Sequence, residues 1–263
     1  MSFRNSAALC CVNFFFVLFA FQADGLFGGI LSNGVFRVEV AANGKTGFLE
    51  IPATEAVFDG ADFTWPMAAS ADIIDTTGSE ALATVLSGFV AFQKGAVLTL
   101  AFSVLSKSSE TEFRVTSPIV EFAPVYLQGA RANSSFVIVD LDGGGSSVVG
   151  GFNGSSKSFR AGYDGAVTTD TMFAEIGPNL AGGPFSAQVA TGQTNGVHAP
   201  PSDAQTTAVQ TEFSFSIQSG DLATGVGVFV VPEPELATWL LFGGTVALAL
   251  RFGRPRLITK KAS

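Results

Sequence analysis

Apolar and polar residues alternate with a period of two along several stretches of this chain, and this alternation most restricts its fold. Phe36, Val38 and Val40 alternate with charged residues, and similar spacing returns at 98–104 and 213–217. Successive side chains of a β-strand point to opposite faces, so the pattern is typical of a strand with one buried face. Such half-buried strands are characteristic of antiparallel sheets.

Shorter candidate strands lie between turns rich in Gly, Asn and Asp, and residues 80–92 fit either a strand or a short helix. The candidate strands are residues 46–51, 112–116, 119–122, 136–139, 185–190 and 225–231. Residues 191–202 contain several glycines and prolines and predict a long exposed loop. Many short strands predict one all-β domain over 24–230, an antiparallel β-sandwich or jelly roll.

The N-terminus has the pattern of a secretory signal peptide over residues 1–23. Arg4 precedes an apolar stretch at 7–21, and polar residues follow from Gln22. The chain is therefore expected to be exported through the Sec translocon, with an uncleaved anchor as the alternative. Cys10 and Cys11, the only cysteines, lie inside this stretch, so the body has no disulfide and no thiolate metal site.

A second apolar run, residues 236–250, lies near the C-terminus and is followed by a tail without acidic residues, 251–263. The cations of this tail are Arg251, Arg254, Arg256, Lys260 and Lys261. As a helix the run reaches ~22 Å against ~30 Å of bilayer hydrocarbon, so it predicts a short transmembrane helix. The basic tail places the body on the far side of the membrane. The alternative is a buried core helix.

Between the domain and this run stands Val231-Pro232-Glu233-Pro234. Proline fixes φ and removes a backbone donor, so the segment cannot join a sheet interior or extend the following helix. We expect an extended, accessible segment of the kind that a processing enzyme needs. The alternative is a rigid spacer in a permanently anchored type I membrane protein.

The order of motif, apolar run and basic tail resembles the PEP-CTERM sorting signal of exosortase substrates. In that family the signal holds the protein in the inner membrane, with its ectodomain in the periplasm, until exosortase cuts near the motif. The resemblance implies an exported Gram-negative protein that ends on the outer surface or in the extracellular matrix, with exopolysaccharide as a possible partner. It covers residues 231–263 only. The tail departs from the family pattern because Phe252, Gly253 and Pro255 dilute the basic cluster.

The body of the chain is strongly acidic. Residues 24–232 hold 20 acidic and 8 basic residues, a net charge of −12. Such a charge disfavours nucleic acids and anionic surfaces as partners. A well-solvated surface accounts for it without any ligand.

Few residues of the body suggest metal or cofactor chemistry, and we expect no cofactor. His198 is the only histidine, so a catalytic triad or a multi-histidine zinc site lacks its partners. Asp140 and Asp142 precede a glycine run and are a weak calcium candidate, because Gly151 stands where an EF-hand loop needs its glutamate. The alternative is a strand that ends in a glycine turn.

These observations predict a non-enzymatic protein of structural or adhesive type with no catalytic residues. The alternative from another class is a secreted polysaccharide hydrolase, whose two carboxylates would come from different strands. Its candidate acids are Glu39, Glu50, Glu112, Glu121, Asp164 and Glu175. The body's aromatic residues are mostly Phe, which indicates an aromatic core rather than a sugar-binding cleft.

Overall fold

The computed structural model describes residues 29–30, 32, 34–93, 95–108, 110–152, 154, 157–177, 179–194 and 205–232. The predicted signal peptide, His198, Glu233, Pro234, the apolar run at 236–250 and the basic tail all lie outside this part of the chain. Within it, no helix is long and apolar enough to cross a membrane.

About two thirds of the described chain is β-strand, and it contains one short 3-10 helix at Ala53–Glu55. The strands are β1 (Gly29–Ile30), β2 (Gly34–Ala42), β3 (Lys45–Pro52), β4 (Val57–Asp59), β5 (Asp62–Pro66), β6 (Ala71–Ile74), β7 (Ala81–Gln93), β8 (Val97–Ser106), β9 (Thr111–Thr116), β10 (Val120–Tyr126), β11 (Arg131–Asp140), β12 (Ser146–Gly150), β13 (Phe159–Tyr163), β14 (Met172–Ile176), β15 (Leu180–Gly182), β16 (Ala187–Thr194), β17 (Gln205–Ile217) and β18 (Asp221–Val230).

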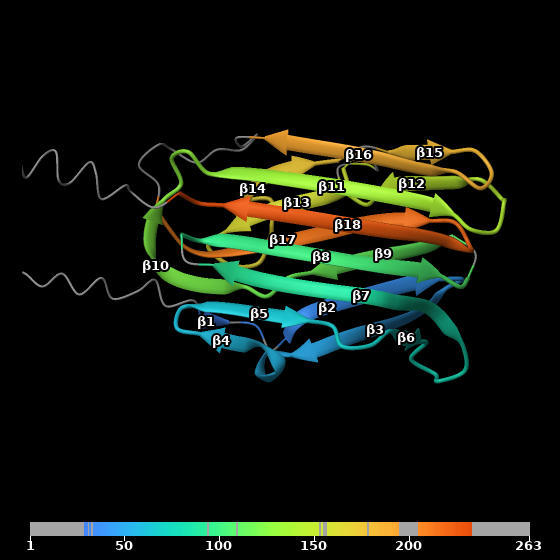
Figure 1. Ribbon diagram of the computed structural model, residues 1–263, viewed down its shortest axis with the longest axis horizontal. Coiled ribbons are helices and arrows are strands. Elements are labelled where there is room, and N and C mark those ends of the chain that lie inside the picture. Colours follow the sequence, from blue (N-terminus) through green and yellow to red (C-terminus); the bar gives the residue numbers. More distant parts are fainter. Residues whose placement is uncertain are drawn as a thin grey trace, which may run out of the picture.

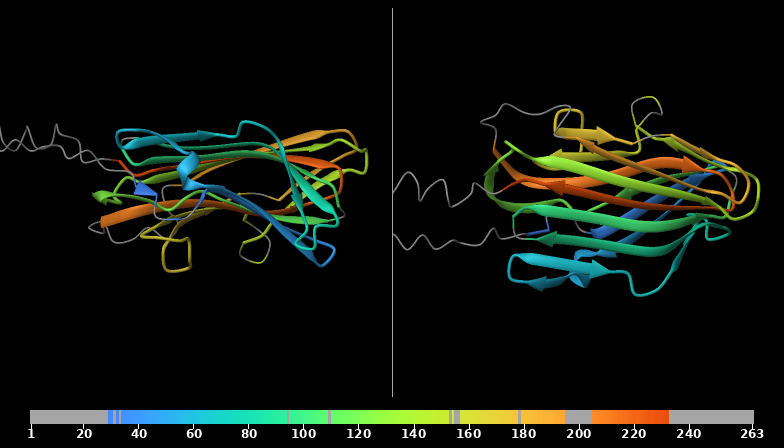
Figure 2. Two further views of the ribbon diagram at one scale, coloured as in Figure 1. Left: turned by 90° about the horizontal axis from the view of Figure 1, so that it is seen from below. Right: turned by 45° about the horizontal axis from the view of Figure 1, so that its top comes forward.

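The strands form two antiparallel sheets that pack face to face (Figure 1; Figure 2, left). The first sheet has 10 strands in the order β1-β10-β17-β9-β2-β3, with β12 and β13 also paired to β17. The second has 8 strands in the order β16-β11-β18-β8-β7-β5-β4. The architecture confirms the predicted all-β, sandwich-like fold.

Phenylalanine fills the space between the sheets. Ten Phe side chains are among the largest that are fully buried. Phe102 and Phe136 from the second sheet meet Phe213 and Phe215 from the first, with ring centroids of Phe102 and Phe213 5.0 Å apart. Stacked and edge-to-face rings of this kind stabilise a core beyond the area they bury.

Glycines in the middle of β18 make room for these rings. A Cβ on Gly225 would clash with the ring of Phe102, and one on Gly227 would clash with the rings of Phe159 and Phe213. Glycine usually weakens a strand interior, but here its missing side chain lets the rings of Phe159 and Phe213 from the facing sheet, and of Phe102 from the neighbouring strand β8, approach the backbone.

The stretches with regular alternation are strands in the structure. Residues 36–40 lie in β2, 98–104 in β8 and 213–217 in β17, each with its apolar side chains buried. Residues 46–51, 112–116, 136–139 and 225–230 are also strands, and 120–122 begin β10.

Two predicted segments differ from the structure and one ambiguity is resolved. Residues 80–92 fall almost entirely in β7, whose pairing with β8 shifts register between Val85 and Ser87 and so interrupts the alternation. The strand predicted at 185–190 begins only at Ala187, since Phe185 is 74% exposed in a turn with φ of 52°. The predicted loop at 191–202 is wrong for 191–194, which pair with β11 as part of β16.

Candidate functional site

The predicted sorting motif begins where the chain leaves the sandwich. Val231 is fully buried and its N–H donates to the carbonyl of Ala96 at 3.1 Å. The next residue, Pro232, is exposed and lies beyond β18. Within the described part of the chain, burial therefore falls off inside the motif, between its first and second residues.

Asp140 and Asp142, the calcium candidates of the sequence, lie where β11 ends and the glycine turn begins. Asp140 is buried, and its carboxylate accepts N–H groups of Asp142 and Gly143 on Oδ1 and of Gly145 and Phe185 on Oδ2, at 2.8–3.1 Å. Burial disfavours the ionised form, but these four donors outweigh it and lower the pKa of Asp140 to about 2. The turn thus holds Asp140 as an anion.

A third carboxylate, that of Asp221, joins this pair. Asp221 begins β18 directly opposite Asp140 of β11, and one oxygen from each of Asp140, Asp142 and Asp221 lies within 4.8 Å of the others. Asp221 is fully buried and neither of its carboxylate oxygens has a hydrogen-bond partner. Burial first, and then the charges of Asp140 and Asp142, raise the pKa of Asp221 to about 6.

The close approach of Asp142 to β18 depends on a glycine. Gly220 has a φ of 77°, and a Cβ on it would lie 2.5 Å from Oδ2 of Asp142. Asp142 itself is exposed, so the group of three acids opens to solvent on that side. We call Asp140, Asp142 and Asp221 the acidic cluster.

The acidic cluster and the sorting motif lie at opposite ends of one strand. Asp221 begins β18, and Val231 follows its last residue. At ~3.4 Å per residue the ten-residue strand separates them by ~30 Å. Figure 1 shows β18 running from one pole of the sandwich to the other.

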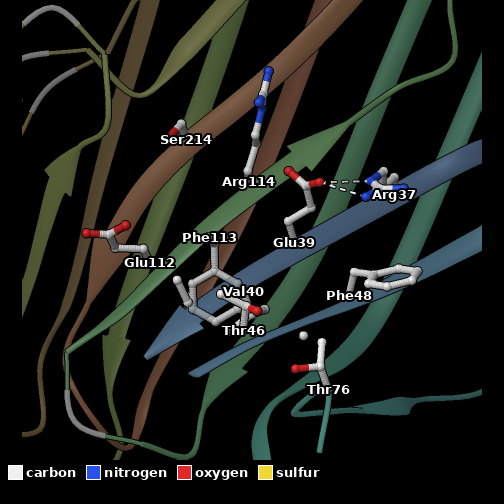
Figure 3. A pocket seen from close by; sticks show the side chains of 12 residues that line it. Arg37, Glu39, Val40, Thr46, Phe48, Thr76, Glu112, Phe113, Arg114 and Ser214 are labelled. Carbon is white, nitrogen blue, oxygen red and sulfur yellow. Dashed lines mark hydrogen bonds and ion pairs between the residues drawn. The ribbon is translucent and has the colours of Figure 1, made fainter. Parts of the chain in front are cut away.

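The outer face of the first sheet carries a shallow depression of about 400 Å³ over β2 and β9. Two of the hydrolase candidates, Glu39 and Glu112, line it (Figure 3). Glu39 accepts two hydrogen bonds from Arg37, and Arg37 also binds Glu50. The carboxylate of Glu112 points away from that of Glu39 in Figure 3.

The remaining hydrolase candidates lie elsewhere. Glu121 is an exposed residue of β10, and Asp164 accepts hydrogen bonds from Thr206 and Thr207. Glu175 is buried and pairs with Arg160 at 2.5 Å. The structure therefore gathers Glu39 and Glu50 around Arg37 and does not join them to these three acids.

An ion pair with one buried and one half-exposed partner crosses the same face. Glu212 of β17 is buried, with its side chain 3% exposed, and accepts from Nε of Arg114 on β9 at 2.6 Å. Burial raises the pKa of Glu212, while Arg114 and the charge of Arg160 oppose that rise and Glu39 adds to it. Cross-strand registers place Glu39 opposite Arg114, and Arg160 opposite Glu212, so opposite charges alternate from strand to strand.

The outer face of the second sheet is almost uncharged. On its three central strands, β11, β18 and β8, the only charged residue that faces outward is Arg131. The other outward residues are Asn133, Ser135, Val137, Val139, Leu222, Thr224, Val226, Val228, Val230, Val97, Thr99, Ala101, Ser103 and Leu105. We call this surface the neutral face. A second depression of about 400 Å³ lies on it, over β11, β16 and β18, and amide and hydroxyl groups of Asn133, Ser135, Thr191 and Gln193 line it.

No protein-family model matches this chain, and no curated protein matches it. Among solved structures, it is similar to an arabinose-bound GH51 α-L-arabinofuranosidase, with TM-score 0.27, 10% identity and 78% of this chain covered. A cyclase from Fischerella sp. TAU matches with TM-score 0.28 and 12% identity over 81% of this chain and 96% of the cyclase. The adhesin domain of Epf from Streptococcus pyogenes matches with TM-score 0.22 and 9% identity over 80% of this chain and 58% of that domain.

This chain spans 27% of the arabinofuranosidase. With TM-scores below 0.3, none of the three likenesses bears on what the chain does.

Sequence reasoning found two members of the acidic cluster and missed the third. Asp221 stands in the turn Ser219-Gly220-Asp221, which looks like an ordinary hairpin connection. Its partner strand β11 is about eighty residues earlier, and no local spacing encodes that pairing. The ion pair of Arg114 and Glu212 was missed for the same reason, because the two residues lie on strands far apart in sequence.

Proposed function

We propose that this chain is an exported surface or extracellular-matrix protein of structural or adhesive type, not an enzyme. It is inserted through its C-terminal run, sorted by the PEP-CTERM-like signal and cleaved by exosortase. The observation that supports this most is the position of the motif. Val231 is the last buried residue of the described chain and Pro232 is exposed, so a cut beyond Pro232 would leave the described sandwich complete.

Replacing Pro232, Glu233 and Pro234 by alanine is expected to trap the protein in the inner membrane. The reason is that alanines would let the segment join the following helix, and a helical backbone cannot enter an active site. The measurement is intact mass of the protein recovered from inner membrane, outer membrane and medium of native cells. Most of the wild type should lack everything beyond about residue 234, whereas the variant should keep its tail.

The matched control replaces two exposed prolines and one exposed glutamate of the domain, Pro52, Pro66 and Glu55, by alanine. This variant should be released like the wild type. Unchanged release of the motif variant would refute sorting by exosortase. A wild type that keeps its full C-terminus in the inner membrane would instead support a permanently anchored protein with a proline spacer.

The adhesive part of the proposal rests on the neutral face. Charged side chains are costly to desolvate, so a surface without them binds a neutral polymer at little electrostatic cost. Its amide and hydroxyl groups suit the hydroxyls of a polysaccharide, and its valines suit the apolar faces of sugar rings. We take the exopolysaccharide of the matrix as the partner of this face.

A lysine at position 226 should weaken that binding. Val226 lies at the centre of the neutral face and is 38% exposed, so Val226→Lys places a cation inside the contact without disturbing the core. The fraction of protein that co-sediments with exopolysaccharide purified from native cells should fall about tenfold, the effect of ~1.4 kcal/mol. Ser216→Lys, beside Glu110 on the other sheet, is the control. Equal binding by the two variants would show that the neutral face is not the contact.

A further inference from the structure

We propose that the acidic cluster of Asp140, Asp142 and Asp221 is a binding site for a divalent cation, Ca²⁺, at the pole of the sandwich opposite the sorting motif. Three acids from two strands and a turn converge there, with one oxygen of each within 4.8 Å of the others. The inference does not depend on the sorting pathway or on the neutral face.

The carboxylate of Asp221 is the feature that calls for a ligand. Asp221 is fully buried, and neither of its carboxylate oxygens makes a hydrogen bond of normal length and angle to the protein. Buried polar groups in native proteins are nearly always hydrogen-bonded, and buried charges are paired or bind metals. Burial and the charges of Asp140 and Asp142 raise the pKa of Asp221, the backbone at Gln218 and Ser147 opposes this only in part, and no basic side chain opposes it.

The neighbouring residues keep two of the three carboxylates close together, and Asp140 ionised, as cation binding requires. Asp140 is kept ionised by four backbone donors, which leave its negative charge uncompensated by any cation among the contacts described. Oδ1 of Asp142 accepts a hydrogen bond from the N–H of Gly144, and Oδ2 lies beside Gly220. A side chain on Gly220 would push Asp142 away, so the glycine preserves the approach of the two strands.

The donor set favours calcium over other metals. All the donors are carboxylate oxygens, the preferred ligands of hard cations, and no thiolate or imidazole takes part. The acids come from a turn and a strand end, where coordination is less rigid than the octahedron that Mg²⁺ demands. Asp221 and Asp142 would hold the ion directly, Asp140 would supply charge and an oxygen, and water would fill the exposed side. The expected Kd is ~0.1–1 mM, as in extracellular calcium modules.

A bound ion would stabilise β18, the last strand of the sandwich, against β11. β18 lies at the centre of the second sheet, between β11 and β8, and the cluster joins its first residue to the end of β11 and the following turn. Calcium would bind the folded chain and not the unfolded one, so it should raise the melting temperature.

The test is thermal unfolding and titration calorimetry of the full chain in mild detergent, with EDTA, CaCl₂, MgCl₂ or KCl of equal ionic strength. For the wild type, 10 mM CaCl₂ should raise Tm by roughly 3–10 °C over EDTA, with a smaller effect of MgCl₂ and none of KCl. Asp221→Asn and Asp142→Asn should each lose this shift. The exposed Asp59→Asn should keep it.

A second expectation separates a metal site from a merely acidic turn. In EDTA, Asp221→Asn should melt above the wild type by roughly 2–6 °C, because the amide removes a buried unpaired charge and donates to the neighbouring carboxylates. If Asp221→Asn does not fold, Asp142→Asn carries the test, since its side chain is exposed. If the wild type shows neither a heat of calcium binding nor a Tm shift, the cluster does not bind calcium and the proposal is overturned. An equal shift in Asp142→Asn would also overturn it.

Discussion

Phe213→Ala is expected to lower the free energy of unfolding by about 3–5 kcal/mol, the range for removing a large aromatic side chain from a core. Phe213 is fully buried, and its ring centroid lies 5.0 Å from that of Phe102 and 4.8 Å from that of Phe159. Its ring also covers the backbone of Gly225 and Gly227, which have no side chains that could move into the cavity. The cavity would therefore stay open, and the cost should lie in the upper part of that range.

Thermal and urea unfolding of the full chain in detergent measure this effect. For a domain of about 200 residues the loss corresponds to a fall in Tm of roughly 6–20 °C. The control is Phe48→Ala, which removes the same side chain from a site that is 57% exposed and should cost far less. Similar losses for the two variants would mean that the aromatic cluster does not hold the sheets together.

The regular strands were predictable because their pattern is local. In β8 every second residue faces inward over the whole strand, so five alternations in sequence report the buried face directly. β7 was ambiguous because its bulge between Val85 and Ser87 changes which residues face inward, and the alternation fails there. Where a bulge breaks the alternation, the periodicity of the sequence no longer indicates which face of the strand is buried.

The sites were less predictable because they depend on which strands become neighbours. Asp140 and Asp142 stand two residues apart and were recognisable as a pair, but Asp221 reaches them only through the register of β11 with β18. That register follows from the apolar residues on both strands and from the glycines under Phe102 and Phe159. Packing in the core thus places the third acid, and the sequence around the acidic residues gives no indication of that packing.

The two outer faces of the sandwich differ in chemistry, and the difference bears on what each one does. The first sheet carries alternating acids and bases that pair across strands, which satisfies its charges within the molecule. The second sheet presents the neutral face, whose polar groups, apart from Arg131, are hydroxyls and amides, with the hydroxyls of Ser103 and Thr224 2.9 Å apart. Contact with a neutral partner therefore suits the second sheet, while the first is stabilised by its own ion pairs.

Arg114→Met is expected to destabilise the protein by about 2–3 kcal/mol at pH 7, below the 3–5 kcal/mol typical of a broken buried pair because Arg114 is half exposed. The variant keeps the aliphatic stem and leaves the buried Glu212 without its main partner. Arg160 still faces Glu212 and limits the loss, whereas Glu39 adds to it. Equilibrium unfolding at pH 7 measures the difference between variant and wild type.

The difference should shrink as the pH falls, and the sign follows from the direction of the pKa shift. Burial raises the pKa of Glu212 above its ordinary value of 4.5, so the folded state binds this proton more tightly than the unfolded state. The contribution of Glu212 to stability is therefore most favourable below pH 4.5 and is lost as the pH rises through its folded pKa. Removing Arg114 raises that folded pKa further and widens the window. Below pH 4.5 Glu212 is neutral in both proteins, so the loss of the ion pair no longer contributes to the difference in their free energies of unfolding.

Glu212→Gln provides the control for this pH dependence, since it keeps the shape of the side chain and removes its charge. In that background Arg114→Met should cost less than about 1 kcal/mol, and the cost should not vary with pH, because only packing and a neutral hydrogen bond are then lost. A loss for Arg114→Met in the wild-type background that stays constant from pH 7 to pH 4 would contradict a charge-based role. It would mean that Arg114 stabilises β9 against β17 mainly through its stem, and that the alternating charges of this face contribute to solubility rather than to stability.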